Sequence, residues 1–182
     1  AVVAAIAGVS TYRWARSPQA DAPISRTKER IWSALTWALL LGLWGGYAWF
    51  FARFSITNHH ALTTRTIDLG LYDQIFWHTS HGRFLGCNFM KSGYHGSAHF
   101  DPFLAILSPL YRLYPRAEFI LGFQSIWIGS GVIPVFLIAR RQLGGRLLGL
   151  LVAVCYAVHP AIHGANMYEF HSLSLSCVPI LW

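Results

Sequence analysis

The sequence contains few charged residues, and acidic residues are especially rare. Of its 182 residues, 12% are charged and only seven are Asp or Glu. Soluble domains carry about a quarter of their residues as charged side chains, so this composition excludes an ordinary soluble domain. Because 54% of the residues are hydrophobic, the chain has the composition of a membrane protein.

Lysine and cysteine are scarce as well. Twelve of the fourteen basic residues are Arg, and they gather at the ends of apolar runs. This distribution argues against nucleic acid as a partner, although the formal net charge is +7. The three cysteines lie far apart, and two of them fall in apolar runs. Their spacing supports neither a disulfide framework nor a Cys-x-x-Cys metal site.

Long uncharged runs make up much of the chain. Residues 31–52 and 119–139 each reach the length of about 20 residues that crosses the hydrocarbon core of a bilayer. Residues 147–165 form a third run if their histidines are neutral, and partial runs occupy 1–9 and 173–182. We therefore expect an all-α, polytopic transmembrane helical bundle, and we expect the chain to be a piece of a longer protein.

Basic residues indicate the orientation of these spans. Residues 11–30 and 140–146 are rich in Arg, which favours the cytoplasmic side, and two crossings separate them, so both assignments agree. The expected order is the end of a transmembrane helix at 1–10, a basic cytoplasmic loop at 11–30, a transmembrane helix at 31–53, an extracytoplasmic loop at 54–118, a transmembrane helix at 119–139, a cytoplasmic turn at 140–146, a transmembrane helix at 147–165, an extracytoplasmic loop at 166–172, and the start of a transmembrane helix at 173–182.

The two extracytoplasmic loops hold most of the ionisable groups. Five of the seven acidic residues fall in them, and all nine histidines lie in these loops or in the adjoining helix end. A site at the outer membrane interface would produce this one-sided distribution. We therefore interpret these loops as the functional face.

The stretch TIDLGLYDQIFWH at 66–78 has the periodicity of an amphipathic helix. One arc of that helix would carry Leu69, Leu71, Tyr72, Ile75 and Phe76. The opposite arc would carry Asp73, Gln74, His78 and His81. We expect interfacial helices, lying in the membrane surface, both here and at 103–113, which is apolar but too short to span.

Several motifs together resemble a known family. They are DLGLYDQIFW from Asp68, HFDP from His99, LYRLYP from Leu110, GFQSIWIGSGVIPVFLIAR from Gly122, and YEFH from Tyr168. They resemble an uncharacterised bacterial family of predicted membrane proteins, which is similar to the GT-C type of membrane glycosyltransferases. That type takes sugars from polyprenyl-phosphate donors outside the cytoplasmic membrane.

The resemblance implies a multi-pass protein of a bacterial cytoplasmic (inner) membrane, with the lipid bilayer and a lipid-linked sugar donor as its partners. It also implies an acidic motif on an interfacial helix, followed at fixed distances by an aromatic residue and a glycine. Asp68, Tyr72 and Gly82 fit that spacing. Leu69 stands where the family usually has a second acidic residue.

Sugar transfer from a polyprenyl phosphate needs a base for the acceptor hydroxyl and cations for the phosphate, which is already a good leaving group. We expect Asp68 to be the base, with Asp73 as the second catalytic candidate. The residues expected to bind substrate are Gln74, Arg65, Arg83, Lys91, Glu169 and His171. The competing interpretations are that Asp68 precedes a helix and caps it, and that Asp73 is a solvated residue.

A second cluster, HGSAHFD, suggests a divalent metal as a candidate cofactor. His95, His99 and Asp101 supply two imidazoles and a carboxylate, a set that forms open metal sites. The alternative is that these histidines bond to lipid headgroups or loop backbone. Further along the chain, Pro160 predicts a kinked helix end, and Gln124 beside small residues predicts close helix packing.

A non-enzymatic accessory subunit of a larger membrane complex is the rival hypothesis, with other membrane protein subunits as partners. Tryptophan is abundant in the spans, as dense packing would require, and four lie along one of them: Trp32, Trp37, Trp44 and Trp49. A transporter ranks last, because the complete spans carry no acidic or basic side chain apart from histidine.

Overall fold

The computed structural model describes residues 25–64 and 66–182, and every regular element in this part of the chain is a helix. The helices are α2 (Arg26–His60), α3 (Thr66–Ser80), α4 (Pro102–Tyr111), α5 (Ala117–Ser130), α6 (Val132–Leu143), α7 (Arg146–Ala157), α8 (Pro160–Met167) and α9 (Cys177–Leu181), with short 3-10 turns η1 (His95–Ser97) and η2 (Ser172–Ser176). The all-α expectation is confirmed for the described residues. The helix end expected at 1–10 lies outside them.

Two helices in the described part are long and apolar enough to cross a membrane: α2, and α5 together with α6. The pair α7 and α8 is a third candidate, bent by 43° at its break. These helices contain the three complete runs predicted from the sequence and extend beyond each of them. A helix continues into the polar residues that flank its apolar run, since its backbone hydrogen bonds do not depend on lipid.

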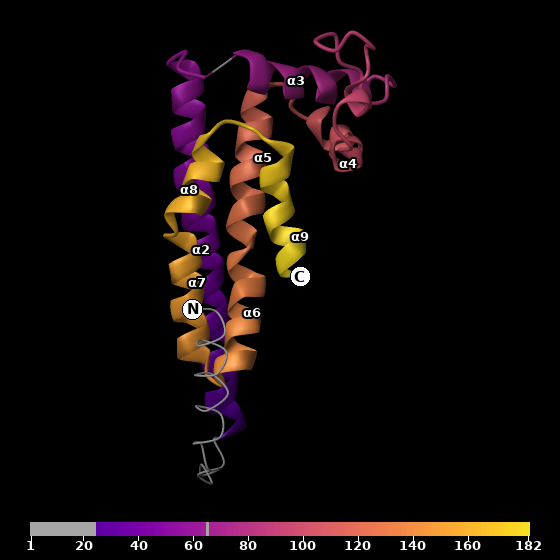
Figure 1. Ribbon diagram of the computed structural model, residues 1–182. Coiled ribbons are helices and arrows are strands. Elements are labelled where there is room, and N and C mark those ends of the chain that lie inside the picture. Colours follow the sequence, from indigo (N-terminus) through magenta and orange to yellow (C-terminus); the bar gives the residue numbers. More distant parts are fainter. Residues whose placement is uncertain (1–24, 65) are drawn as a thin grey trace, which may run out of the picture.

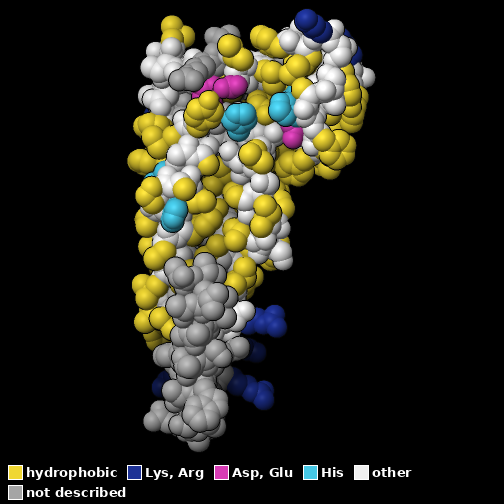
Figure 2. Space-filling model, viewed as in Figure 1, with side chains coloured by type: hydrophobic (Ala, Val, Ile, Leu, Met, Phe, Trp, Pro, Cys, Tyr) yellow, Lys and Arg dark blue, Asp and Glu magenta, His cyan; other side chains and the backbone are white. Residues whose placement is uncertain are grey.

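The candidate spans lie side by side, and α9 runs back along α5 (Figure 1). At one end, which we call the loop end, α3 runs across the bundle axis with α4 packed against it. At the other end, which we call the basic end, α2 begins and a short turn joins α6 to α7. Figure 2 shows acidic side chains and several histidines near the loop end, and Lys and Arg side chains both at the tip of the loop end and in a group at the basic end.

The bend between α7 and α8 follows from Pro160, which cannot donate a backbone hydrogen bond. Two histidines satisfy backbone groups at the break. His159 Nδ1 accepts a hydrogen bond from Ala161 N (3.2 Å), and His163 Nε2 donates to the Ala157 carbonyl oxygen (2.7 Å). The predicted kink at Pro160 is confirmed.

In the bundle core, α2 and α5 pack closely against each other. A Cβ atom on Gly129 of α5 would lie 2.8 Å from Tyr47 Cδ1 and 3.0 Å from Trp44 Cδ1, both on α2. The Trp44 indole also donates a hydrogen bond to the Ile126 carbonyl oxygen (2.8 Å). The predicted close packing around the small residues of this span is confirmed at Gly129. At Gly122 the same construction meets nothing within 4 Å.

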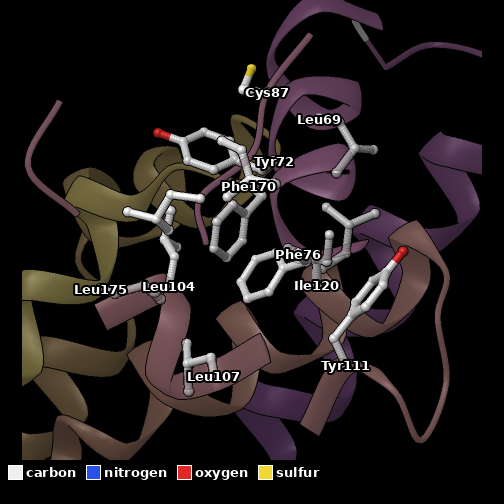
Figure 3. Packing of buried hydrophobic residues seen from close by; sticks show 13 residues of the cluster. Leu69, Tyr72, Phe76, Cys87, Leu104, Leu107, Tyr111, Ile120, Phe170 and Leu175 are labelled. Carbon is white, nitrogen blue, oxygen red and sulfur yellow. The ribbon is translucent and has the colours of Figure 1, made fainter. Parts of the chain in front are cut away.

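A separate hydrophobic core lies beneath α3 at the loop end. Figure 3 shows the aromatic rings of Phe76, Tyr111 and Phe170 grouped in it, and Phe76 stacks on Tyr111 with ring centroids 5.6 Å apart. α3 contributes four buried side chains from its predicted apolar arc: Leu69, Tyr72, Ile75 and Phe76.

His78 departs from the predicted polar arc, because it is buried with 7% of its surface exposed. The chain after α3 folds back over it. Arg83 N donates to the His78 carbonyl oxygen (2.9 Å), and a Cβ on Gly86 would lie 3.0 Å from His78 Cβ. Burial lowers the pKa of His78, and the nearby Arg83 adds to the effect.

Candidate functional site

A cleft of about 490 Å³ opens at the loop end. We call it the loop-end cleft. Its walls come from α3, from the segment before α4, from α8 and from the turn that leads into α9. The residues that line it are Tyr72, His99, Asp101, Ala165, His171, Ser172, Leu173 and Ser174.

Polar side chains converge on Asp101 in this cleft. Asp101 Oδ2 accepts hydrogen bonds from His95 Nε2 (2.9 Å) and from Ser172 Oγ (3.0 Å). Because Ser172 Oγ donates its only hydrogen to Asp101, it acts as the acceptor for the Tyr72 hydroxyl, at 3.0 Å. The result is a continuous chain of hydrogen bonds from α3 to the start of α4.

Tyr72 remains a hydrogen-bond donor at neutral pH. Burial raises the pKa of its hydroxyl, the bond with Ser172 opposes the rise, and the charges of Asp101 and Asp68 add to it. Asp68 lies one helical turn before Tyr72, which places both side chains on the same face of α3. Asp68 is not among the residues that line the cleft.

Asp68 is the third residue of α3 and not the residue before it. The capping interpretation in its simple form is therefore wrong. A carboxylate in the first turn still stabilises the helix, because it interacts with the positive end of the helix dipole.

The turn that carries His171 is anchored by a buried side chain of the bundle. Gln124 of α5 is 0% exposed. Its Nε2 donates to the Glu169 carbonyl oxygen (2.5 Å), and its Oε1 accepts from His171 N (3.0 Å). Glu169 has φ = 80°, a left-handed conformation that is uncommon for a residue other than glycine. Gln124 thus fixes the backbone that brings His171 and Ser172 to the cleft.

The residues predicted to bind substrate are only partly brought together. His171 lines the cleft, whereas Gln74, Arg83, Lys91 and Glu169 do not. Gln74 Oε1 instead accepts a hydrogen bond from Asn88 N (2.6 Å), which ties the loop after α3 to that helix. Arg65 lies outside the described residues.

The second predicted catalytic residue, Asp73, faces a different hollow. That hollow has a volume of about 400 Å³ and is lined by His59, Leu62, Thr64, Leu69, Gly70, Asp73 and Ala117. The Tyr111 hydroxyl donates to Asp73 Oδ1 at 2.7 Å. Burial raises the pKa of the Asp73 carboxyl, while the bond from Tyr111 opposes the rise. Asp73 is therefore a half-buried acid and not a solvated one.

The predicted metal ligands His95, His99 and Asp101 lie near one another, but they are not arranged around a common metal position. Within residues 25–64 and 66–182, no group of three or more His, Cys, Asp and Glu side chains is placed to hold a metal ion. His95 bonds directly to Asp101, and the rings of His95 and His99 lie 5.4 Å apart.

Sequence reasoning missed Ser172 as a partner of Asp101 and Gln124 as the anchor of the turn. Ser172 is 71 residues from Asp101, and Gln124 is 47 residues from His171. No local pattern links such pairs. The one available signal was the expected topology, which places the loop that contains Asp101 and the loop that contains Ser172 on the same side of the membrane.

Comparison with known proteins identifies the family of this chain. No curated protein and no solved structure matches the chain. Residues 58–182 match the family described as predicted membrane protein, DUF2079. The match covers more than half of the chain and includes every residue that lines the loop-end cleft. The chain therefore belongs to the DUF2079 family of predicted membrane proteins.

Proposed function

We propose that the protein is a GT-C type membrane glycosyltransferase, which moves a sugar from a polyprenyl-phosphate donor to an acceptor hydroxyl in the loop-end cleft. It crosses a bacterial cytoplasmic membrane several times with the loop end outside. The observation that carries this proposal is a carboxylate, Asp101, that lines a cleft at the loop end of an apolar bundle.

The distribution of basic residues supports this orientation. The turn between α6 and α7 is short and is flanked by Arg140, Arg141 and Arg146. Arg146 also pairs with Glu29 near the start of α2, so the basic residues of both segments gather at one end. Short basic connections favour the cytoplasmic side.

Apolar side chains beside the cleft suit a lipid-linked donor. Phe100 is 91% exposed and adjoins the lining residue His99, and Leu173, which lines the cleft, is 78% exposed. Such exposure is costly in water and favourable against lipid chains. A polyprenyl tail lies in the bilayer beside these two residues while its phosphate enters the cleft.

The lining side chains can supply what the transfer requires. His99 and His171 are the lining residues that can carry positive charge, so they hold the donor phosphate in place of Arg83 and Lys91. The Tyr72 hydroxyl stays protonated and donates to Ser172 Oγ, which keeps the hydrogen-bond chain to Asp101 in place. A carboxylate takes the proton of the acceptor hydroxyl, and general-base catalysis of this kind contributes roughly 10²–10⁴-fold.

The test is transfer of a labelled sugar from polyprenyl phosphate by membranes that contain the full-length protein. Ser174→Trp fills the cleft and is expected to lower transfer at least about tenfold, which corresponds to 1.4 kcal/mol. Thr63→Trp, at an exposed residue after α2, is the matched control and should transfer normally. Absence of transfer by the wild-type protein contradicts the proposal and favours the accessory subunit.

A further inference from the structure

We infer that Asp101 is the proton acceptor of the loop-end cleft, and that His95 positions it. The inference rests on the proposed function, and it moves the role of base from Asp68 to Asp101.

The position of Asp101 would ordinarily give it a structural task. It directly precedes α4, whose first residue is Pro102, and an Asp at that position normally accepts hydrogen bonds from the free amide groups of the first turn. The Asp101 side chain makes no such bond. Its carboxylate turns instead to His95 and Ser172, and it lines the cleft.

The two hydrogen bonds to Asp101 fall on the same oxygen, Oδ2. Within the described residues, no side chain or backbone group donates to Oδ1. A carboxylate that is held firmly by one oxygen and keeps the other for a substrate is the arrangement that a general base needs. Asp68 lacks this arrangement, because it is not a lining residue.

His95 is built into the loop-end core, with 1% of its surface exposed. Its backbone N donates to the Leu85 carbonyl oxygen (2.9 Å), and its ring lies 6.0 Å from that of Tyr72. Because Nε2 faces a carboxylate, that nitrogen carries the proton. Among the described residues, Nδ1 has no hydrogen-bond partner, so the bond to Asp101 is the one that this buried ring makes.

The other ionisable groups that line the cleft or act on Tyr72 come from three segments of the chain. Tyr72 and Asp68 belong to α3, His99 follows η1, and His171 precedes η2. A His95 variant removes one of the two donors to Oδ2 and leaves these residues and the donor Ser172 unsubstituted. A change caused by loss of that donor can therefore be separated from changes in the rest of the cleft.

The proposed step is balanced within the cleft. The acceptor oxygen uses an electron pair to bond to the anomeric carbon of the donor sugar, and its proton passes to Asp101 Oδ1. The bond between the anomeric carbon and the phosphate oxygen breaks, and polyprenyl phosphate leaves with that electron pair. Asp101 then releases its proton to water.

The experiment measures kcat and KM for sugar transfer by the full-length protein in membranes. Asp101→Asn should lower kcat at least about 100-fold, because an amide cannot take the proton. Asp68→Asn should lower it less, because Asp68 does not line the cleft. Glu118→Gln is the matched control: Glu118 also pairs with a histidine, His60, at 3.0 Å, but it does not line the cleft.

His95 is tested with two variants. His95→Leu removes a donor that holds the carboxylate in place, so kcat should fall at least about tenfold while KM changes little. His95→Gln keeps a donor and should lose less of kcat. Thermal unfolding of each variant reports whether the protein is folded.

Three results would overturn the inference while the proposed function stands. They are transfer by Asp101→Asn within about threefold of wild type, a larger loss in Asp68→Asn than in Asp101→Asn, and an unchanged kcat in a folded His95→Leu variant. Absence of transfer by the wild-type protein would instead refute the proposed function itself.

Discussion

At the residue scale, the three aspartates of the loop end differ in their surroundings. Asp101 receives two hydrogen bonds on one oxygen and lines the cleft. Asp68 lies in the first turn of α3, and its charge acts on Tyr72. Asp73 is half-buried beside Tyr111 and faces another hollow. Three identical side chains within one loop thus have different chemical capacities, which spacing alone does not distinguish.

Asp73 should make stability depend on pH. Burial raises its pKa above the ordinary value of 3.8. The folded protein therefore binds this proton more tightly than the unfolded chain does. Its contribution to stability is complete below pH 3.8 and is lost as the pH rises through the folded-state pKa.

Asp73→Asn removes this titration while keeping an acceptor for the Tyr111 hydroxyl. The variant should gain thermal stability relative to wild type as the pH rises above the ordinary carboxyl range, by a few degrees near neutrality. Thermal unfolding in detergent across that range measures the difference. A difference that does not change with pH would show that Asp73 does not titrate as described.

At the scale of elements, the sequence predicts helices more reliably than it predicts what covers them. The apolar runs gave the candidate spans, because a bilayer core demands about 20 apolar residues. The 3.6-residue period gave the buried side of α3 through Leu69, Tyr72 and Phe76. It failed at His78, because burial there depends on the path of the following loop. The hydrogen bond between Ser172 and Asp101 could not be predicted from the sequence pattern either, since the two residues are 71 positions apart.

The contact between α2 and α5 gives a prediction at this scale. Gly129→Ala places a Cβ 2.8 Å from a ring atom of Tyr47 and 3.0 Å from one of Trp44. Since both rings are rigid, overpacking should cost about 1–3 kcal/mol. Thermal unfolding measures this loss.

Gly122→Ala, on the same helix, provides the control, because its Cβ meets nothing within 4 Å. It should be neutral or stabilising by up to about 1 kcal/mol, as the helix propensity of alanine suggests. Equal losses in the two variants would contradict the packing argument.

At the scale of the whole molecule, the two ends of the bundle have different chemistry. The basic end carries a short turn between neighbouring helices, whereas the loop end carries α3, α4 and the cleft. The proposed transfer requires that the loop end face away from the cytoplasm. Orientation is therefore a property that can be measured independently of activity.

Cysteine labelling in intact cells tests this orientation. In a variant without the three natural cysteines, Lys91→Cys at the loop end should react with a maleimide that cannot cross membranes. Gln142→Cys, near the basic end, should react only after the membrane is permeabilised. Both positions are exposed in the fold, so accessibility within the protein does not bias the comparison. The reverse labelling pattern would place the cleft in the cytoplasm and contradict the proposed function.

The unequal lengths of the candidate spans have a consequence for the lipid. α2 has 35 residues and is about 52 Å long, whereas the α7 and α8 pair covers 146–167, about 33 Å along its path. A bilayer core of about 30 Å matches the shorter path and leaves part of α2 outside. At the loop end, α2 therefore extends further along the bundle axis than α8 does. The shorter helix, α8, contributes to the wall of the cleft. Lipids with longer acyl chains would raise the hydrocarbon boundary against that step, so in the proposed orientation a thicker membrane would bring this boundary nearer to Asp101.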